Sequence, residues 1–298
     1  MNTKFIMIIF LIVAMFTAGC GDDSDSDKAG SSVPTEKTAQ NTAFPKVPAN
    51  DVIAADDFSN LQLNDITKPI YDKHTIWERQ EAGLPMALPE IREYSQGKIA
   101  YLTFDDGPDD KNTPMILDIL KNYGIHATFY VCGNMVEAYP QVLRRIYEEG
   151  HAIGNHSYNH VYKELYPSTD NFLKQISDTD ELIKSVIGVR PLIIRTPGGR
   201  VGMWTPDYEP LMTACGYVEH DWNISVEDAT AKRPTPQDMI RFVDEQTNRP
   251  LKDDAALILM HSNKGKENTA AALPGIIKVL VDKGYKFGVV TPMTPQPW

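Results

Sequence analysis

Residues 98–108, KIAYLTFDDGP, determine how the rest of this chain can be interpreted. A short apolar run ends directly in Asp105 and Asp106, which are followed by a Gly-Pro pair. Apolar runs that stop abruptly at such a turn are typical of buried strands. We therefore expect a strand over residues 98–104, with the two aspartates at its carboxyl end.

From this strand onward, strand patterns alternate with helix patterns. Further strands are expected at 127–131, 151–154, 192–194, 217–222, 256–260 and 286–290. Apolar residues at helical spacing predict helices at 113–123, 139–149, 168–187, 208–215, 236–249 and 271–283. Seven strands separated by helices predict an α/β fold with a parallel sheet, and this number of units favours a closed or nearly closed barrel over an open sheet. A nucleotide-binding fold is disfavoured, because no glycine-rich fingerprint follows the first strand.

The composition excludes several classes of protein. Of 298 residues, 42% are hydrophobic and 23% charged, which rules out a wholly disordered chain. With 29 basic and 40 acidic side chains, the net charge of −11 argues against nucleic acid as a partner and against a polybasic contact with lipid. Three cysteines cannot form a disulfide scaffold. We expect Cys132 and Cys215 to be buried thiols, although an exported protein could pair them.

The N-terminus carries a targeting segment. Its twelve consecutive apolar residues, 5–16, fall short of the ~20 needed for a membrane-spanning helix and are typical of a secretory signal peptide. The residues at 17–20, TAGC, resemble a bacterial lipoprotein signal, which implies that Cys20 becomes the lipidated first residue of the mature protein. The alternative is an ordinary signal peptide cleaved near Ala18. Thr17 departs from the lipoprotein pattern, which more often has Leu there.

The chain is expected to divide into four segments. These are a lipoprotein-type signal peptide at 1–19, a flexible acidic tether at 20–47, an N-terminal extension at 48–96 and a main domain at 97–298. The tether is rich in Asp, Ser, Thr and Pro, a composition typical of linkers. The extension is expected to pack against the main domain through a helix at 70–81 and an extended segment at 84–89.

Polar side chains follow five of the expected strands. They are Asp105 and Asp106, His156 and His160, Arg195, Asp221 and Asp228, and His261. Taken singly, each has an ordinary explanation as a turn former, a surface residue or a salt-bridge partner. Together they lie at the strand ends where parallel barrels place their chemistry. The sequence therefore predicts an active site at that end of the sheet.

Two of these histidines suggest a metal site. His156 and His160 are four positions apart, so one helical turn would place both imidazoles on the same face. Two imidazoles and one carboxylate suit zinc or a similar divalent ion, with further positions open to water and substrate. Only one of the two adjacent aspartates need bind the metal, and the other can act as a base.

Four motifs in order carry a resemblance to a known family. They are TFDDGP at 103–108, HSYNH at 156–160, RTPGG at 195–199 and LILMH at 257–261. Together they resemble the polysaccharide deacetylases of the NodB-like family, carbohydrate esterase family 4, over about residues 97–292. The resemblance implies a distorted seven-stranded (β/α) barrel of the NodB-homology type. It also implies a metal-dependent N-deacetylase that hydrolyses an acetamide to acetate and a free amine.

The resemblance also implies a role for each residue of the first two motifs. Asp106, His156 and His160 would hold the divalent metal, with zinc in first place and cobalt, nickel or manganese as alternatives. The metal would polarise the acetamide carbonyl. Asp105 would be the general base, and Arg195 would orient it and favour its ionised form.

The later motifs supply the acid and the substrate contacts. By the resemblance, His261 would be the general acid that protonates the leaving amine. A backbone N–H at Gly198 would stabilise the oxyanion, and Leu259 would line a pocket for the acetyl methyl group.

Two departures from the family pattern are visible. Residues 198–199 are both glycine, whereas the family often has an aromatic residue after the proline of this motif. The Asp-Trp pair expected before the last motif aligns best with Asp228, followed by Ala229 in place of Trp. Asp221 is a poorer candidate because it is expected to lie within a strand. Trp222 could fill the vacated wall of the pocket.

The leading hypothesis is an N-deacetylase of a cell-envelope glycan, with peptidoglycan first. We expect export, a lipid anchor at the outer face of the bacterial cytoplasmic membrane and an N-acetylated glycan as partner. Rival hypotheses are an O-acetyl esterase acting on acetylated xylan, a chitin oligosaccharide deacetylase and a non-catalytic glycan-binding lipoprotein. The remaining histidines, His74, His126, His151 and His220, match no motif and are expected to be structural or exposed.

Overall fold

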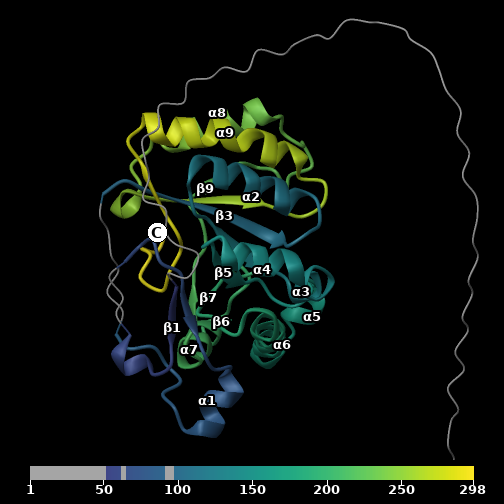
Figure 1. Cartoon of the computed structure of the whole chain (residues 1–298), viewed down its shortest axis with the longest axis vertical. Helices are drawn as coiled ribbons and strands as arrows, with labels where there is room; N and C mark the ends of the chain where they lie inside the picture. The colour runs from purple at the N-terminus through teal and green to yellow at the C-terminus, as the bar shows by residue number, and fades with distance from the viewer. Residues whose placement is uncertain (1–51, 62–64, 91–96) are drawn as a thin grey trace, which may run out of the picture. The chain divides into compact units, whose positions relative to one another are not determined.

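Residues Ile99–Gly107 form β3, the longest strand that the computed structural model describes (Figure 1). The structure describes residues 52–61, 65–90 and 97–298. Every residue of β3 except Asp106 is buried. A strand covered on both faces needs a nearly continuous apolar run rather than alternation, which is the pattern in the sequence.

β3 belongs to a curled parallel sheet. Its eight strands are β3, β4 (Thr128–Val131), β5 (Ala152–Asn155), β7 (Ile193–Ile194), β8 (Val218–Glu219), β9 (Ile224–Ser225), β10 (Ala255–His261) and β11 (Lys286–Gly288). The strand order is β8-β7-β5-β4-β3-β10-β9, and β11 pairs with the first three residues of β3. All pairings in this sheet are parallel.

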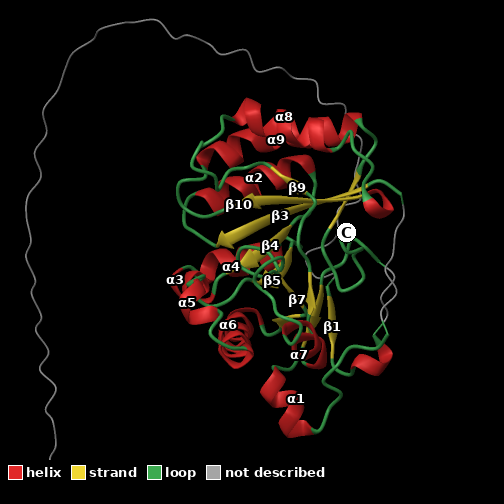
Figure 2. Cartoon of the chain, turned by 180° about the vertical axis from the view of Figure 1, so that it is seen from behind, coloured by secondary structure: helices red, strands yellow, loops and turns green. Residues whose placement is uncertain are grey.

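The α/β fold and the (β/α) barrel character are confirmed, with two differences in detail. All seven expected strands are present, but β9 is an additional strand of two residues, too short to leave a periodic pattern. The sheet is curled (Figure 2). It does not close: among the described residues no pairing joins β8 to β9, at the two ends of the order. The structure is therefore an open, distorted barrel.

Helices cover this sheet. They are α2 (Asn112–Tyr123), α3 (Gly133–Ala138), α4 (Pro140–Glu148), α5 (Tyr162–Leu165), α6 (Thr169–Ile187), α7 (Tyr208–Ala214), α8 (Pro236–Gln246) and α9 (Glu267–Asp282), and a 3-10 turn spans Lys252–Asp254. Local signals set their ends: Ser168 caps the start of α6, and Gly188 ends it with a left-handed φ of 81°. α9 begins at Glu267, before the expected residue 271, and Pro274 lies inside the helix.

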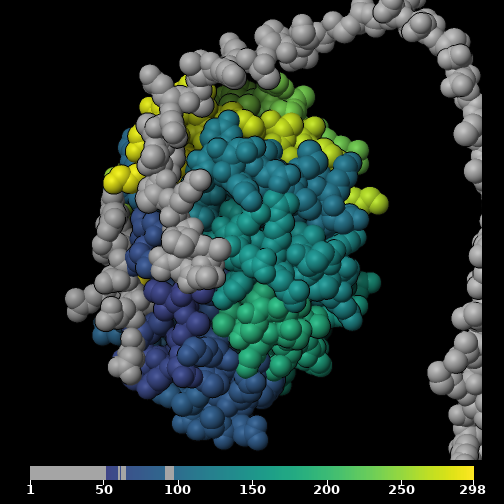
Figure 3. Space-filling view, in the orientation of Figure 1, coloured from purple at the N-terminus to yellow at the C-terminus, as the bar shows by residue number. Residues whose placement is uncertain are grey.

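The N-terminal extension forms a second, smaller sheet with the main domain. It contains β1 (Ile53–Ala55), a 3-10 turn (Phe58–Asn60), β2 (Ile70–Asp72) and α1 (Ile76–Ala82), and β2 pairs with β6 (Arg190–Pro191). The expected helix over 70–81 is wrong at its start. Residues 70–72 are a strand, because Thr75 caps α1 in a capping box with Glu78 and the helix cannot begin earlier. Figure 3 shows this extension (purple to blue) against the teal and green surface of the main domain.

A buried ion network joins the extension to the main domain. Asp72 accepts hydrogen bonds from Arg79 Nε at 2.6 Å and from Arg190 Nε at 3.0 Å. Arg190 Nη1 also lies 3.5 Å from Asp180 of α6. All four side chains are fully buried, so each charge depends on its partners for the solvation that water would otherwise provide.

The remaining expectations concern the cysteines, the N-terminal segment and membrane-spanning helices. Cys132 and Cys215 are buried free thiols, as expected. The signal peptide at 1–19, lipidation at Cys20 and the tether at 20–47 lie outside the described residues. None of the described helices combines the length and the apolar character needed to cross a membrane.

Candidate functional site

The candidate residues converge at the carboxyl ends of five strands. Asp105 and Asp106 lie just before the last residue of β3, residues 156–160 follow β5, Arg195 follows β7, Asp228 lies beyond β9 and His261 ends β10. Because the strands are parallel, these ends lie on one edge of the sheet, where parallel barrels carry their chemistry. This arrangement agrees with the sequence-based expectation.

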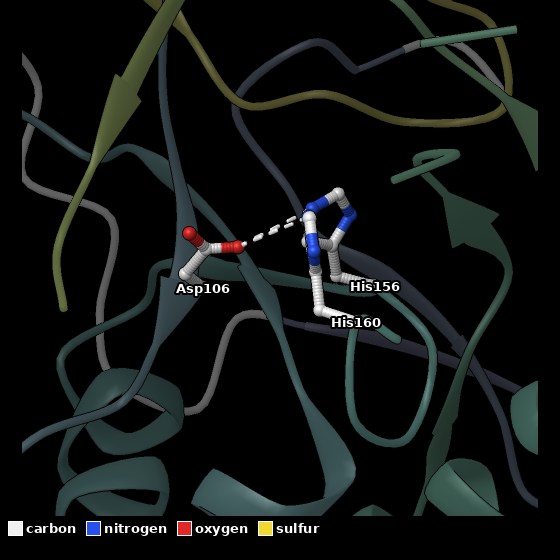
Figure 4. Close-up of side chains that lie close together, drawn as sticks. All are labelled: Asp106, His156 and His160. Carbon is white, nitrogen blue, oxygen red and sulfur yellow. Dashed lines mark ion pairs between the residues drawn. The ribbon is translucent and has the colours of Figure 1, made fainter. Parts of the chain in front are cut away.

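Asp106, His156 and His160 form a cluster of potential metal ligands. Asp106 Oδ1 lies 3.6 Å from the Nε2 atom of each histidine, and the three ligand atoms lie within 4.8 Å of one another (Figure 4). This Oδ1 is buried and accepts no hydrogen bond among the described residues. A buried carboxylate oxygen without a donor, facing two imidazole nitrogens, fits a divalent cation.

The protonation of His156 also fits a metal ligand. Its Nδ1 lies 2.8 Å from the backbone oxygen of Arg195, an acceptor, so Nδ1 carries the proton and Nε2 keeps its lone pair. Burial lowers the pKa of His156 to about 3, so the imidazole is neutral at physiological pH.

The segment that carries both histidines is a loop, which corrects the expected helical turn. Ser157 and His160 have left-handed φ angles of 69° and 58°. Side chains hold this shape: Asn155 Oδ1 accepts from the Ser157 N–H at 3.0 Å, and Ser157 Oγ accepts from the His160 N–H at 3.2 Å. The imidazoles still face one another, with ring centroids 5.1 Å apart. Strained backbone of this kind is concentrated at functional sites.

The Asn155 side chain connects this loop to the buried ion network. Asn155 Nδ2 donates to Asp180 Oδ1 at 2.7 Å, and Asp180 Oδ2 accepts from the Tyr217 hydroxyl at 2.5 Å. Neither Asn155 nor Asp180 was singled out from the sequence. An isolated polar residue inside an apolar pattern carries no signal of its partner.

Arg195 holds Asp105 beside the ligand cluster. The fully buried guanidinium donates to Asp105 Oδ1 at 2.9 Å and to Thr103 Oγ1 at 2.6 Å. Asp105 Oδ2 is left facing His156 Nε2 at 3.8 Å. Burial raises the pKa of Asp105, and the Arg195 charge opposes that rise. One oxygen of Asp105 therefore accepts from Arg195, and the other faces the ligand cluster.

His261 and Asp228 form a second charged pair. His261 lies opposite Asp105 in the register of β10 and β3. Its Nδ1 is 2.7 Å from Asp228 Oδ1, while Asp228 Oδ2 accepts from the His261 N–H and from Thr269 Oγ1. Burial disfavours the imidazolium, but the hydrogen bond and charge of Asp228, together with the charges of Asp105 and Asp106, raise the pKa of His261 above its ordinary value.

Asp221 takes a different position from Asp228. It lies beyond β8 rather than inside a strand, and its carboxylate accepts from the Arg200 N–H at 3.1 Å. Asp221 thus holds the loop that follows Arg195, whereas the carboxylate that contacts His261 is that of Asp228.

The three expected substrate contacts lie around the same edge. Leu259 is two residues before His261 on β10, so both side chains are on one face of the strand. The Gly198 N–H has no hydrogen-bond acceptor among the described residues. Trp222 packs on the neighbouring glycine: a Cβ at Gly199 would lie 3.0 Å from its ring.

One aromatic residue beside the cluster was missed. Tyr162 is 42% exposed, and its ring centroid is 5.5 Å from that of His160. A Cβ placed on Gly198, which has φ +83°, would lie 2.5 Å from the Tyr162 hydroxyl. The ring therefore occupies the space beside the RTPGG motif where the family pattern has an aromatic residue. The sequence offered one signal, the glycine at position 198 where the family often has an aromatic residue. That signal did not indicate that Tyr162 would fill the space.

Asn263 is a further polar contact that the motifs did not indicate. It lies two residues after His261, and its Nδ2 donates to Asp106 Oδ2 at 3.3 Å. Asp106 thus presents one oxygen to Asn263 and the other to the two histidines.

The four histidines outside the motifs have structural contacts. His151 and His220 are buried, and burial lowers their pKa values to about 3 and about 4. His74 Nε2 lies 2.7 Å from Asp56, and His126 packs edge-on against His151. None of them is part of the ligand cluster.

Comparison with known proteins agrees with this geometry. A family model described as polysaccharide deacetylase matches residues 92–219. The chain is 33% identical over 235 residues to the peptidoglycan-N-acetylmuramic acid deacetylase PdaC of Bacillus subtilis, covering 77% of this chain and 47% of that protein. It is 33% identical over 198 residues to a peptidoglycan-N-acetylglucosamine deacetylase of Bacillus cereus, covering 65% and 67%.

The fold is likewise shared with solved structures. A CE4 esterase of Streptococcus mutans superposes with a TM-score of 0.62 at 34% identity, covering 70% of this chain and 99% of that one. The chain spans about half the length of the Bacillus subtilis relative and two thirds of the Bacillus cereus relative.

Proposed function

The chain belongs to the polysaccharide deacetylases of carbohydrate esterase family 4, and from this premise we propose that it removes N-acetyl groups from N-acetylhexosamine units of peptidoglycan. One observation carries the proposal. A buried carboxylate, Asp105, and a histidine with a raised pKa, His261, flank a cluster of three potential metal ligands. Hydrolysis of an amide needs a base, an acid and an electrophile in this arrangement.

Asp106, His156 and His160 are the residues that would hold the metal, and zinc suits two imidazoles and one carboxylate. When bound, a divalent ion would polarise the acetamide carbonyl and lower the pKa of an attacking water. Asp105 Oδ2, which faces the cluster, would take the proton from that water. Arg195 would keep Asp105 oriented through its contact with Oδ1.

Protonation of the leaving group is assigned to His261. Held by Asp228 through Nδ1, its Nε2 is free to donate a proton to the leaving nitrogen. The Gly198 N–H would donate to the developing oxyanion. Leu259, on the same face of β10 as His261, would contact the acetyl methyl group.

Peptidoglycan is proposed as the substrate because both relatives described above are named for it. One name specifies N-acetylmuramic acid and the other N-acetylglucosamine. Export is consistent with these relatives. We further propose that a lipid on Cys20 anchors the enzyme at the outer face of the cytoplasmic membrane, which would place it next to this polymer.

The mechanism is tested by separating metal binding from turnover. Asp105→Asn should lower acetate release from N-acetylglucosamine oligomers by about 10³-fold, because the base is lost, while zinc measured by mass spectrometry after dialysis stays bound. His156→Ala should lose both zinc and activity. His74→Ala, a histidine outside the cluster, serves as the matched control and should lose neither.

Two outcomes would contradict the proposal. Turnover by Asp105→Asn at the wild-type rate would rule out the assigned base and would favour a role in glycan binding for the carboxylate. Acetate release from acetylated xylan alone, with none from N-acetylglucosamine oligomers or peptidoglycan, would show that the substrate is an O-acetylated glycan.

A further inference from the structure

A cleft of about 760 Å³ lies next to the acid pair and takes no part in the mechanism above. It is lined by residues 228–231, 233 and 234, after β9, by Met239 of α8, and by residues 264–269, around the start of α9. Asp228, which holds His261, is part of its wall. The cleft therefore adjoins the candidate site at the Asp228–His261 pair.

The cleft carries an excess of positively charged side chains that have no acidic partner in it. Its two carboxylates are occupied, since Asp228 is bonded to His261 and Glu267 is paired with Lys111 at 2.8 Å. Arg233 and Lys264 line the cleft, are exposed and form no ion pair among the described residues. Lys266 donates to the Asp228 backbone oxygen at 2.8 Å, which keeps its ammonium group in the wall. In a protein with a net charge of −11, such a local excess of cations favours an anionic ligand.

The chain connects this cleft directly to the metal-ligand cluster. Asn263 donates to Asp106, and Lys264 is the next residue. One short segment thus contacts a candidate ligand and lines the cleft. The cleft is thus joined to both sides of the candidate site, through the 263–264 segment and through Asp228.

We propose that this cleft binds a carboxylate carried by the sugar on the carbon next to the acetamido group. The inference rests on the proposed function and narrows its substrate. In N-acetylmuramic acid the lactyl ether at C3 adjoins the acetamide at C2, whereas N-acetylglucosamine is neutral there. The cleft therefore selects muramyl units for deacetylation. The carboxylate can be the lactyl group itself or that of a peptide joined to it, since both offer the same chemistry to Arg233 and Lys264.

The test compares matched glycans with the full chain. The substrates are peptide-free peptidoglycan tetrasaccharide, the same tetrasaccharide with its lactyl carboxylates converted to methylamides, a peptide-bearing tetrasaccharide and neutral chitotetraose. We expect the ratio of kcat/KM between the carboxylate form and the methylamide form to fall about tenfold in the double variant Arg233→Gln/Lys264→Gln, through KM. Raising the salt to about 0.5 M should lower the wild-type ratio and change that of the variant less.

A matched control lies in the same loop. Lys232 is exposed and next to Arg233 but does not line the cleft, so Lys232→Gln removes a charge without removing a contact. Its ratio should equal that of the wild type. The charge reversal Lys264→Glu should lower the ratio further than Lys264→Gln, and thermal melting should show that all variants are folded.

Each result decides the question. If the double variant changes kcat/KM relative to the methylamide form for neither the peptide-free nor the peptide-bearing glycan, the cleft proposal is overturned while deacetylation stays intact. Failure of the wild type to release acetate from every glycan would instead overturn the proposed function and the cleft with it. If only the peptide-bearing form shows the effect, the bound carboxylate is that of the peptide; if the peptide-free form shows it too, the lactyl group is sufficient.

Discussion

Tyr162 supplies an aromatic surface beside Gly198, at a point where the RTPGG motif itself has no aromatic residue. The glycine leaves room beside the ligand cluster, and Tyr162, which is 42% exposed, fills it. Carbohydrate sites combine a few placed polar groups with apolar and aromatic walls. The exposed ring next to His160 is therefore a surface on which a sugar can stack.

Tyr162→Ala is expected to raise KM for oligosaccharide substrates about tenfold, because the stacking surface is lost, with a smaller effect on kcat. Tyr162→Phe keeps the ring and should remain near the wild type. Steady-state acetate release measures both. Trp77→Ala, at an exposed aromatic residue of α1, is the control, and an equal rise in KM there would contradict a specific role for Tyr162.

The pH dependence of the reaction should reveal the contact between His261 and Asp228. The general acid must be protonated, so activity is lost as the pH rises through the pKa of His261. Asp228 keeps that pKa raised against burial. Asp228→Asn removes the charge, so the alkaline limb of kcat/KM should move about one unit toward lower pH. Glu227→Gln, at the exposed neighbour, should leave the limb in place; an unmoved limb in Asp228→Asn would exclude His261 as the titrating acid.

At the scale of elements, the buried ion network connects parts of the fold that are far apart in sequence. β2, α1, α6 and β6 each contribute one charge, and Asn155 extends the contacts to the loop that carries the candidate ligands. Removing one member leaves a charge in a low-dielectric interior without its partner. The network thus couples the extension to the main domain.

Arg190→Met should lower the free energy of unfolding by about 3–5 kcal/mol, because Asp72 and Asp180 lose a buried partner. Urea unfolding followed by circular dichroism measures the loss. Lys174→Met is the control, since the Lys174–Asp178 pair is 70% and 45% exposed and should cost less than about 1 kcal/mol. A loss in Arg190→Met no greater than in the control would show that the network adds little to stability.

At the scale of the whole molecule, the net charge of −11 disfavours adsorption to anionic lipid. Any association with the membrane would then need another source. A lipid-modified Cys20 would supply it, since two acyl chains on one residue make a stable anchor.

Cys20→Ser should move the protein from the membrane fraction to the soluble fraction of cells and abolish its labelling with radioactive palmitate. Cys132→Ser removes a buried thiol and should leave both properties unchanged. Labelling that persists in Cys20→Ser would exclude this residue as the lipidation site, and an unlabelled wild-type protein would favour an ordinary signal peptide.

Much of the architecture could be predicted because it depends on local pattern. Apolar runs, helical periodicity and turn residues identified seven strands, and strand ends identified the acidic and histidine residues. Among the strands that were not predicted, the two-residue β9 follows closely on the segment assigned to β8, and Ile70 of β2 was assigned to the following helix. The loop at 156–160 was expected as a helical turn, since spacing alone does not reveal left-handed φ angles.

The sequence by itself determined which residues could do chemistry and that parallel strands would bring them to one edge. The tertiary structure alone decided how they pair. It left one oxygen of Asp106 without a donor between two imidazoles, gave the His261 contact to Asp228 rather than Asp221, and supplied Tyr162 beside Gly198. The physical reason is that hydrogen bonds, burial and excluded volume act between residues distant in sequence, whereas periodicity reports only on neighbours along the chain.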